Sequence, residues 1–474
     1  MSNSHFTNLL IKSVKLPPFR RTILKKMDRE LHRSIVENDK THLKAIQEKR
    51  YDFVDSMLHM AIGNLDKGWI TSKEIEKLSG IFVENTMLSN IASKREIRDK
   101  FKAEHGFSAP NFITISPSQA CNLHCYGCYA CSEADSSPHL PFDVVDRIIG
   151  ETRDKWGASF VVVSGGEPYM YRDGGKTLVD LFEKYPDMFF MTYTNGTLID
   201  EKMAKRFAEL GNVSPAISVE GFEKETDGRR GKGTYGKVLK AFDNLRKAGV
   251  PFGISVTATS RNCETLLKDD FYDFYFEQQG ATYMWQFQFM PIGRGKGVFD
   301  LVVPPDKRVL LYRKWETQMH EKKHCIADFW NSGVLTHGCV AYGGNRGYIY
   351  IDWNGDIMPC VFVPYSADNI LKLFEEGKTM TDALMNTFMR KGRIWQNEYS
   401  INDKMHPQNL LMPCSIRDHY INFSKNILTA QASGENNEAD EIMSDGEYLQ
   451  KMDEYDRKLS SLTQPIWEKD YLRR

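Results

Sequence analysis

Three cysteines occur close together in the segment CNLHCYGC, as Cys121, Cys125 and Cys128. Three thiolates on one short loop can each bind a different iron of a cubane cluster and leave the fourth iron open to a substrate or cofactor. A zinc site or a closed electron-transfer cluster is the alternative, because Cys131 could add a fourth thiolate and His124 could coordinate or hydrogen-bond. Tetrahedral zinc normally takes two paired groups of ligands, and no separate second C-x2-C pair lies nearby. The spacing therefore favours an iron-sulfur cluster with one open iron.

Short polar segments follow three of the apolar runs further along the chain. Residues 164–168 read SGGEP, where the glycines let a ligand approach the backbone and the carboxylate can receive an ammonium group. Residues 194–197 read TNGT, and residues 218–221 read SVEG. Because these segments follow predicted strands, we expect all of these groups to lie at the same pocket as the cysteine loop.

The elements that must position these groups begin at about residue 110. Short β-branched and aromatic runs alternate there with helical segments, which predicts parallel β/α units. Six such units indicate an α/β fold with a partial TIM-like barrel, and barrels of this kind carry their chemistry at the C-terminal ends of the strands. The predicted strands are residues 112–116, 160–164, 189–193, 216–219, 252–257 and 283–290, and the predicted helices include 142–155, 202–210 and 235–248.

Four parts of the chain are predicted. They are an N-terminal helical region at residues 1–106, the partial barrel at 107–304, a small α+β domain at 305–432, and an acidic tail with a terminal helix at 433–474. In the third part, Asn354-Gly355 between residues 347–352 and 357–361 predicts a β-hairpin. Residues 433–445 are acidic and rich in small side chains, which predicts a mobile segment.

The stretch from Pro18 to Arg33 predicts an amphipathic helix. Such a helix can lie on an anionic membrane surface, or it can pack its apolar stripe on the protein's own core, as most amphipathic helices do. The apolar face carries Phe19, Ile23, Leu24, Met27 and Leu31, and the remainder carries Arg20, Arg21, Lys25, Lys26, Arg29 and Arg33.

Composition excludes several classes of protein. The 62 Lys and Arg residues balance 63 Asp and Glu residues, so the charge is not that of a nucleic-acid-binding coat, and we expect no nucleic-acid partner. No apolar run approaches the roughly 20 residues that span a bilayer, and the N-terminus lacks the features of a secretory signal. We therefore expect a cytoplasmic protein, peripheral to the membrane if the N-terminal helix binds lipid. In reducing cytosol, the nine cysteines favour metal ligation or catalysis over disulfides.

The cysteine loop, the GGEP and SVEG segments and the six β/α units between about residues 110 and 300 together resemble the radical S-adenosylmethionine superfamily. The resemblance implies that Cys121, Cys125 and Cys128 hold a [4Fe-4S] cluster, whose unique iron is chelated by the amino and carboxylate groups of S-adenosylmethionine. An electron from a donor such as flavodoxin or ferredoxin would then cleave this cofactor to a 5′-deoxyadenosyl radical, which can remove hydrogen from unactivated carbon.

The same resemblance implies roles for single residues. Gly165, Gly166 and Glu167 resemble the strand-end segment that binds the methionine amino group. Asn195, after the third strand, is expected at the same cofactor site.

The fourth strand ends in two further expected cofactor contacts. Ser218 and Glu220 resemble the positions that contact the ribose or the methionyl moiety. Arg230 is expected to pair with the cofactor carboxylate, and Arg229 could serve instead.

The adenine side of the site departs from the family pattern at one position. The residue before the third cysteine is usually aromatic, whereas here it is Gly127, so Tyr126 or Tyr129 would have to provide the stacking ring. Ile254 and Val256 lie on the strand that resembles the adenine-binding one and could form the adenine wall, although plain barrel packing is the favoured interpretation of each residue singly.

The C-terminal region resembles the auxiliary-cluster extensions called SPASM and twitch domains. Cys339 precedes the predicted hairpin, Cys360 ends a G-x4-C segment, and Cys414 would be the third thiol. A full SPASM domain has more cysteines, so the resemblance implies a twitch-like second [4Fe-4S] cluster, completed by Cys325, His337 or the substrate. The alternative is that these thiols are buried apolar groups, which free cysteines often are.

Two other residues indicate a function less specifically. Cys263 has no partner in this pattern and is expected in the core. Arg294, within the segment MPIGRG, could hold an anionic substrate group, and a turn with a solvated Arg is the alternative.

Three functions follow from these patterns. The first is a radical enzyme that abstracts hydrogen from a peptide side chain for oxidation or cross-linking, with the second cluster taking up the electron or binding the substrate. The second is the same chemistry on a membrane lipid, suggested by the basic N-terminal helix. The third is a non-catalytic iron-sulfur electron carrier, which would not need the polar residues gathered at the strand ends.

Overall fold

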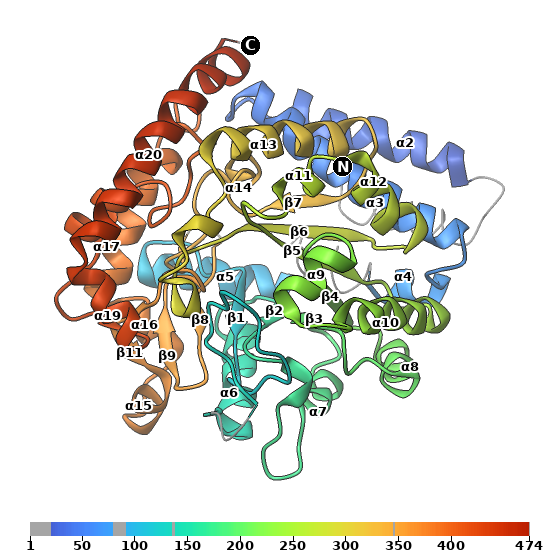
Figure 1. The fold of residues 1–474 in the computed structure, drawn as a ribbon, viewed down its shortest axis with the longest axis horizontal. Coiled ribbons are helices and arrows are strands. Elements are labelled where there is room, and N and C mark those ends of the chain that lie inside the picture. The colour runs from blue at the N-terminus through green and yellow to red at the C-terminus, as the bar shows by residue number, and fades with distance from the viewer. Residues whose placement is uncertain (1–19, 79–91, 135–137, 345–346, 474) are drawn as a thin grey trace.

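The computed structural model describes residues 20–78, 92–134, 138–344 and 347–473 (Figure 1). It has a mixed α/β fold with a helical N-terminal region, and each of the six predicted barrel strands is present close to its predicted bounds. The strands are β1 Phe112–Ile115, β2 Phe160–Val163, β3 Phe189–Thr194, β4 Val213–Val219, β5 Gly253–Ala258, β6 Tyr283–Gln288, β7 Ile326–Asp328, β8 Tyr350–Ile351, β9 Asp356–Met358, β10 Tyr365–Ser366, β11 Asp368–Asn369 and β12 Ser433–Gly434.

Strands β1 to β6 pair in parallel and in sequence order, as a partial barrel requires. Strand β7 extends the sheet in parallel beside β6, and β8 extends it in parallel beside β1. Strands β8 and β9 form the predicted hairpin, with Tyr350 opposite Met358. The sheet therefore crosses the predicted boundary at residue 304, and the division into four parts stays a prediction.

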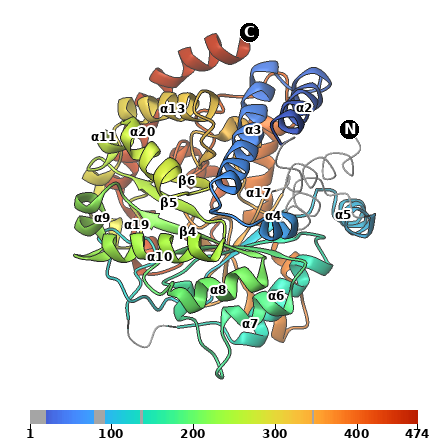
Figure 2. The ribbon, with the colours of Figure 1, turned by 90° about the vertical axis from the view of Figure 1, so that its right-hand side faces the viewer.

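Helices lie outside the curved sheet, as Figures 1 and 2 show. Helix α8 illustrates their local signals, because the Asp200 side chain accepts from the Met203 N–H at its start and Gly211 ends it in the left-handed conformation. The α-helices are α2 Arg20–His32, α3 Lys44–Asp66, α4 Ser72–Leu78, α5 Ala92–His105, α6 Phe142–Asp154, α7 Leu178–Lys184, α8 Glu201–Leu210, α9 Glu223–Arg230, α10 Thr234–Ala248, α11 Cys263–Leu266, α12 Asp269–Tyr272, α13 Pro305–His320, α14 Gly333–Thr336, α15 Ile370–Glu375, α16 Met380–Ala383, α17 Thr387–Gln396, α18 Tyr420–Asn422, α19 Asn437–Ser444 and α20 Gly446–Trp467.

The apolar face of α2 packs on α3. Met27 is fully buried and forms a cluster with Leu58 and Ile62, against which Ile23 and Leu24 also pack. The predicted amphipathic helix is therefore present as a docking helix, and its described apolar stripe is not free to enter a lipid surface. Phe19, which was expected on the same stripe, lies outside the described residues.

The acidic C-terminal segment is ordered, contrary to the prediction of a mobile tail. Strand β12 pairs with β10, and α19 follows with the Asn436 side chain accepting from the Ala439 N–H at its start. The prediction relied on the acidic composition and did not consider the apolar face of this helix, on which Ala439 and Ile442 are buried. Helix α20 then packs along α13.

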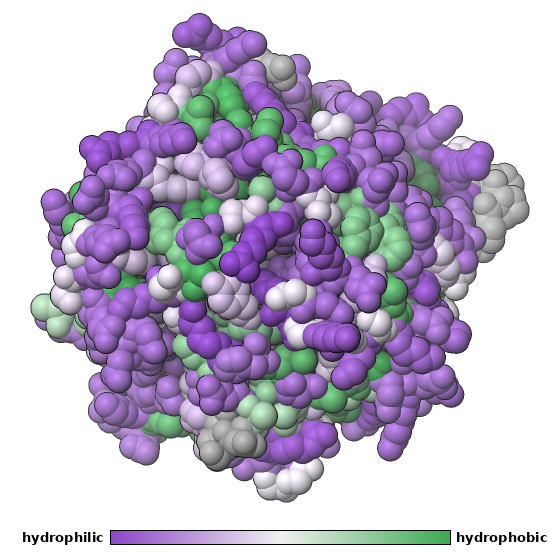
Figure 3. All heavy atoms as spheres, viewed as in Figure 1, coloured by the Kyte–Doolittle hydropathy of each residue, from purple (hydrophilic) through white to green (hydrophobic). Residues whose placement is uncertain are grey.

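The outer surface is mostly hydrophilic on the face in Figure 3, with apolar areas scattered among charged side chains. Among the described residues, no helix is long and apolar enough to cross a membrane.

Candidate active site

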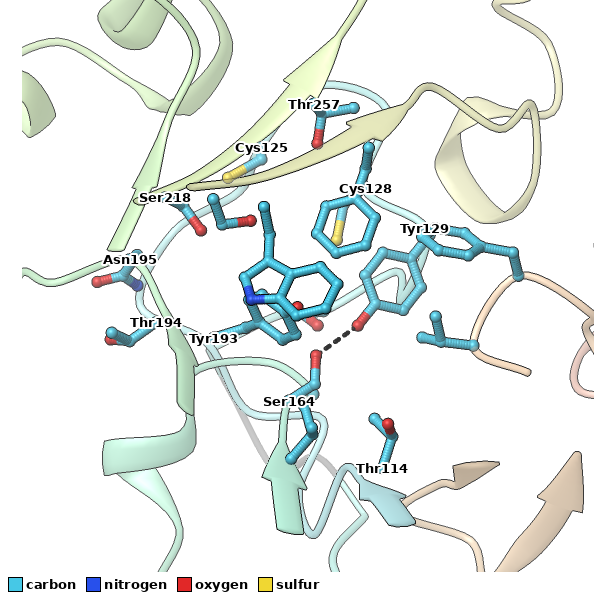
Figure 4. Close-up of a pocket in the computed structure, with 18 of the residues that line it drawn as sticks. Thr114, Cys125, Cys128, Tyr129, Ser164, Tyr193, Thr194, Asn195, Ser218 and Thr257 are labelled. Atoms are coloured by element: carbon cyan, nitrogen blue, oxygen red, sulfur yellow. Dashed lines mark hydrogen bonds between the residues drawn. The ribbon is translucent and has the colours of Figure 1, made fainter. Parts of the chain in front are cut away.

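A cavity of about 230 Å³ opens at the C-terminal ends of the barrel strands (Figure 4). The residues expected at the first cluster and the cofactor converge on it from the cysteine loop and from β2, β3 and β4. Those that line it are Cys121, Cys125, Cys128, Gly165, Gly166, Asn195, Ser218, Arg229 and Arg230.

The cysteine loop is anchored to the strand ends through its backbone. The Arg294 N–H donates to the Cys128 carbonyl at 3.1 Å, and the Arg294 guanidinium donates to the Ser132 carbonyl at 2.9 Å. On the other side, the Tyr126 N–H donates to the Arg229 carbonyl at 2.9 Å. Arg294 thus clamps this loop and is not solvated, while its Nε and Nη2 are buried without a hydrogen-bond partner, so the substrate-anion interpretation stays a prediction.

The two glycines after β2 are required by the cysteine loop itself. A Cβ at Gly165 would lie 2.6 Å from the Ser118 carbonyl oxygen, and φ is +119° there. A Cβ at Gly166 would lie 2.1 Å from the Ala120 carbonyl oxygen. Such distances are far inside van der Waals contact, so only glycine lets the loop backbone pack on this strand end.

Gly127 and the tyrosines around it settle which ring faces the cavity. Gly127 has φ of +66°, and a Cβ there would lie 2.9 Å from the ring of Phe289, which leaves no room for an aromatic residue. Tyr129 lines the cavity, and its hydroxyl is 2.8 Å from the Ser164 hydroxyl. Tyr126 is 42% exposed beneath the guanidinium of Arg261, so it points away.

Glu167 lies behind the cavity wall and joins the ends of β2 and β3. Its carboxylate accepts from the Thr194 hydroxyl at 2.7 Å, from the Asn195 N–H at 2.8 Å and from the Tyr169 N–H at 3.3 Å. Burial raises the pKa of Glu167 to about 7, against the lowering effect of these donors. Its geometry is that of a group that fixes the neighbouring strand end.

Asn195 connects this strand end with the cysteine loop. Its side-chain N–H donates to the Asn122 amide oxygen at 2.8 Å and lies 3.9 Å from the Cys121 sulfur. Asn195 therefore contacts both the cavity and a thiol of the loop.

Glu220 is buried between two arginines. One of its oxygens accepts from Arg229 at 2.7 Å and from the Arg230 guanidinium at 2.5 and 2.9 Å. These guanidinium groups lower the pKa of the Cys125 thiol, although burial raises it overall. Because iron binds the thiolate form, the nearby cations favour the form that a cluster needs.

Of the two interpretations of Ile254 and Val256, barrel packing is confirmed. Ile254 and Val256 are fully buried on the helix-facing side of β5, where they belong to the main core. Ser255 and Thr257, which alternate with them, line the cavity. The period of two along a strand was the sequence signal that could have identified them.

The opposite wall of the cavity is aromatic and comes from distant parts of the chain. The rings of Phe287 on β6 and Phe329 after β7 lie 5.5 Å apart, and Phe362 after β9 lies within 5.7 Å of both. Phe112 on β1 stacks on Tyr348 at 4.8 Å. These pairings depend on long-range contacts, so the sequence carried no signal for them.

The three C-terminal thiols lie behind this aromatic wall. The Tyr348 hydroxyl is 2.9 Å from the Cys360 sulfur, and burial raises the pKa of Cys360 to about 12. Burial also raises the pKa of Cys414, and negative charge on Cys339 and Cys360 would raise it further, so these two thiols are near Cys414. Among the described residues, no set of three or more His, Cys, Asp or Glu side chains converges as a site for a single metal ion.

The residues expected to complete or surround these sites lie elsewhere. The Cys325 sulfur accepts a hydrogen bond from the Ser56 hydroxyl, and the His337 ring stacks on His42 at 4.2 Å. Cys263 is buried in the core, as expected.

The donor set at the cysteine loop fits a cubane cluster. Cys121, Cys125 and Cys128 present three thiols to one cavity, and each thiolate of such a cluster binds a separate iron, so convergence on a single point is not required. Arg229 and Arg230 beside the thiols offset the negative charge that deprotonation creates.

Comparison with known proteins identifies a radical SAM domain. The radical SAM superfamily model matches residues 115–260. The AdoMet-dependent heme synthase of Methanosarcina barkeri is 27% identical over 344 residues, which cover 66% of this chain and 89% of that protein. The mycofactocin maturase MftC of Mycobacterium ulcerans is 27% identical over 325 residues, which cover 67% of this chain and 82% of the maturase.

A solved structure agrees in fold. SuiB of Streptococcus suis bound to S-adenosylmethionine aligns with a TM-score of 0.51 at 17% identity, over 77% of this chain and 87% of SuiB. The matched segment spans the cysteine loop and the strand ends that surround the cavity. Residues 115–260 thus form a radical SAM domain, and the chain is an enzyme whose cofactors are a [4Fe-4S] cluster and S-adenosylmethionine.

Proposed function

We propose that Cys121, Cys125 and Cys128 bind the [4Fe-4S] cluster and that the enzyme abstracts hydrogen from a peptide side chain. The cluster supplies the electron that cleaves S-adenosylmethionine to the 5′-deoxyadenosyl radical. The observation that carries this proposal is a single cavity, in which the three thiols and the strand-end polar groups face an aromatic wall.

The polar wall is suited to the cofactor. Arg230 can pair with its carboxylate, and the hydroxyls of Ser218, Ser255 and Thr257 can bond to its ribose and adenine. Glu167 holds the Asn195 backbone in place at the edge of this wall. Gly165 and Gly166 let the thiol loop lie directly against it.

The aromatic wall supports an uncharged substrate group. Among the described lining residues, Arg229 and Arg230 are the only ones with strongly basic or acidic side chains. Both lie on the cofactor side of the cavity beside Glu220, where Arg230 is proposed to pair with S-adenosylmethionine. A tetrapyrrole such as heme carries propionate carboxylates, which would find no free cation on this wall. An apolar or aromatic peptide side chain suits the wall, and the maturase relative gives the same indication.

The second thiol group supports an oxidation. Cys339, Cys360 and Cys414 are proposed to hold a second [4Fe-4S] cluster behind the aromatic wall, where it can take up an electron from the substrate side. The products would then be an oxidised or cross-linked peptide. Flavodoxin or ferredoxin stays the expected donor for the first cluster.

The lipid alternative is not favoured. It depended on the apolar face of the N-terminal helix, which packs on α3 through Met27.

Deuterium transfer tests the substrate class. The reconstituted enzyme is incubated anaerobically with dithionite, S-adenosylmethionine and pools of short peptides in which Tyr, Phe or Leu is deuterated in its side chain. We expect deuterium in 5′-deoxyadenosine from at least one pool, and none from a pool deuterated only in Lys and Glu. Deuterium that comes only from a deuterated iron porphyrin or fatty acyl lipid would contradict the proposal.

A further inference from the structure

Tyr348 contacts both the substrate cavity and the C-terminal thiol group. Its side chain lines the cavity, and its hydroxyl lies 2.9 Å from the Cys360 sulfur. The residue is 2% exposed, so bulk water does not compete for this contact. A single side chain therefore connects the wall that faces the substrate with a proposed cluster ligand.

The orientation of the Tyr348 hydroxyl is fixed by packing. The ring stacks on Phe112 at 4.8 Å with an interplanar angle of 12°. The Phe362 N–H approaches the same sulfur at 3.5 Å from another side. Cys360 thus has two preformed donors around it, and among the described residues the Tyr348 hydroxyl is the side-chain donor to this sulfur.

The direction of the hydrogen bond follows from the chemistry of the ligand. Between a neutral phenol and a neutral thiol, either group could donate. A thiolate has no proton, so once Cys360 binds iron only the phenol can donate. A bond from a neutral donor to a charged acceptor is stronger than one between neutral groups.

We propose that Tyr348 is a positioning residue that donates a hydrogen bond to the Cys360 thiolate and raises the reduction potential of the second cluster. This inference rests on the proposed function, because it requires a cluster on Cys339, Cys360 and Cys414. Hydrogen bonds to the sulfurs are one of the features that set cluster potentials. Donation withdraws negative charge from the sulfur, which stabilises the reduced cluster and favours uptake of an electron.

Tyr342 provides a matched control. It is also a fully buried tyrosine near the three thiols, but its hydroxyl lies 2.7 Å from the Ser415 hydroxyl. It does not belong to the residues that line the cavity. Tyr342→Phe therefore removes a buried phenol of the same region without removing a bond to sulfur.

The test is a redox titration followed by electron paramagnetic resonance on the reconstituted full-length chain. Tyr348→Phe keeps the ring and its stacking on Phe112, so we expect unchanged iron per chain, a lower midpoint for the second cluster and an unchanged midpoint for the first. Tyr342→Phe should leave both midpoints at the wild-type values.

Each other result counts against the inference. If Tyr348→Phe titrates as wild type, the hydrogen bond has no effect and Tyr348 is only packing. If this variant alone loses the second cluster, the tyrosine is needed for assembly and not for tuning. If wild type shows one cluster, and Cys339, Cys360 and Cys414 can all be changed to Ala without loss of iron, the proposed second cluster fails together with the inference.

Discussion

At the scale of single residues, close approach of backbones shapes the site as much as the ligands do. Gly165 and Gly166 read in the sequence as a place where a ligand meets the backbone, yet the neighbour that excludes a Cβ is the cysteine loop. The types and spacing of Cys121, Cys125 and Cys128 could be interpreted from sequence because each residue type carries its own chemistry. The group that packs against a glycine cannot be predicted from sequence, because it is determined by tertiary packing.

Gly166→Ala should reduce the iron bound at the first cluster. The added Cβ would lie 2.1 Å from the Ala120 carbonyl oxygen, so the loop must move away from the strand end. We expect most of the iron of this cluster to be lost, as counted per chain after anaerobic reconstitution. Gly236→Ala is the control, because nothing lies within 4 Å of its Cβ in α10 and the change should stabilise the helix by about 0.5–1 kcal/mol. Equal iron in the two variants would contradict the packing argument.

Thr257→Val should weaken binding of S-adenosylmethionine. The change keeps the shape of the side chain and removes a hydroxyl that faces the cavity. One lost hydrogen bond corresponds to about a 3- to 10-fold higher Kd by anaerobic calorimetry. Ile254→Val, on the opposite face of β5, should leave the Kd unchanged and cost about 0.5–1.5 kcal/mol of stability. The reverse pattern would restore Ile254 as the wall residue.

At the scale of elements, apolar runs predicted the parallel strands well because strands buried on both faces are apolar along their length. Strand β5 departs from this pattern, because Ser255 and Thr257 alternate with apolar neighbours and this period of two separates the cavity face from the core face. The helix from Arg20 to His32 was predicted correctly, but sequence alone could not choose between lipid and protein for its apolar face. The choice depended on the cluster that α3 supplies through Leu58 and Ile62.

Met27→Ala should detach or loosen α2. Met27 is fully buried in its small cluster, and truncation of such a side chain costs about 2–5 kcal/mol. We expect faster limited proteolysis within α2 and a lower thermal midpoint. Lys25→Ala, on the exposed side of the same helix, should behave as wild type. If both variants resist proteolysis equally, the packing of α2 on α3 contributes little.

At the scale of the whole molecule, the region after the barrel folds back on the first barrel strand. Strand β8 pairs with β1, so the C-terminal hairpin lies beside the strand that precedes the cysteine loop. This pairing brings Tyr348 against Phe112 and completes the cavity wall. Sequence reasoning assigned the hairpin and the barrel separately and could not predict their contact, because the paired residues are more than 200 positions apart.

Contacts between the N-terminal and C-terminal regions should make stability depend on pH. Burial and the nearby charges of His42, Arg50 and Lys404 lower the pKa of His337 to about 3, while Asp39 opposes them. The unfolded chain binds a proton near pH 6.5 and the folded chain does not, so stability falls as the pH decreases from about 6.5 towards 3. The slope from this group is about 1.4 kcal/mol per pH unit.

His337→Asn should reduce this acid sensitivity. His337 has φ of +58°, a conformation that Asn tolerates better than most residues. We expect a smaller difference in thermal midpoint between pH 7 and pH 5 than in wild type. His406→Asn is the control, because His406 is exposed and its loss should leave the difference unchanged. If His337→Asn shows the same difference in thermal midpoint between pH 7 and pH 5 as wild type, other groups cause the acid sensitivity.

The most direct test of the whole account is anaerobic formation of 5′-deoxyadenosine. Wild type, the variant with Cys121, Cys125 and Cys128 all changed to Ala, and Cys263→Ala as a buried-thiol control are each reconstituted with iron and sulfide. Dithionite and S-adenosylmethionine are added, and the product is measured by mass spectrometry. We predict 5′-deoxyadenosine from wild type and from Cys263→Ala, and none from the triple variant. Equal product from the triple variant, or none from wild type that carries its full iron, would contradict the assignment of the cluster to these three cysteines.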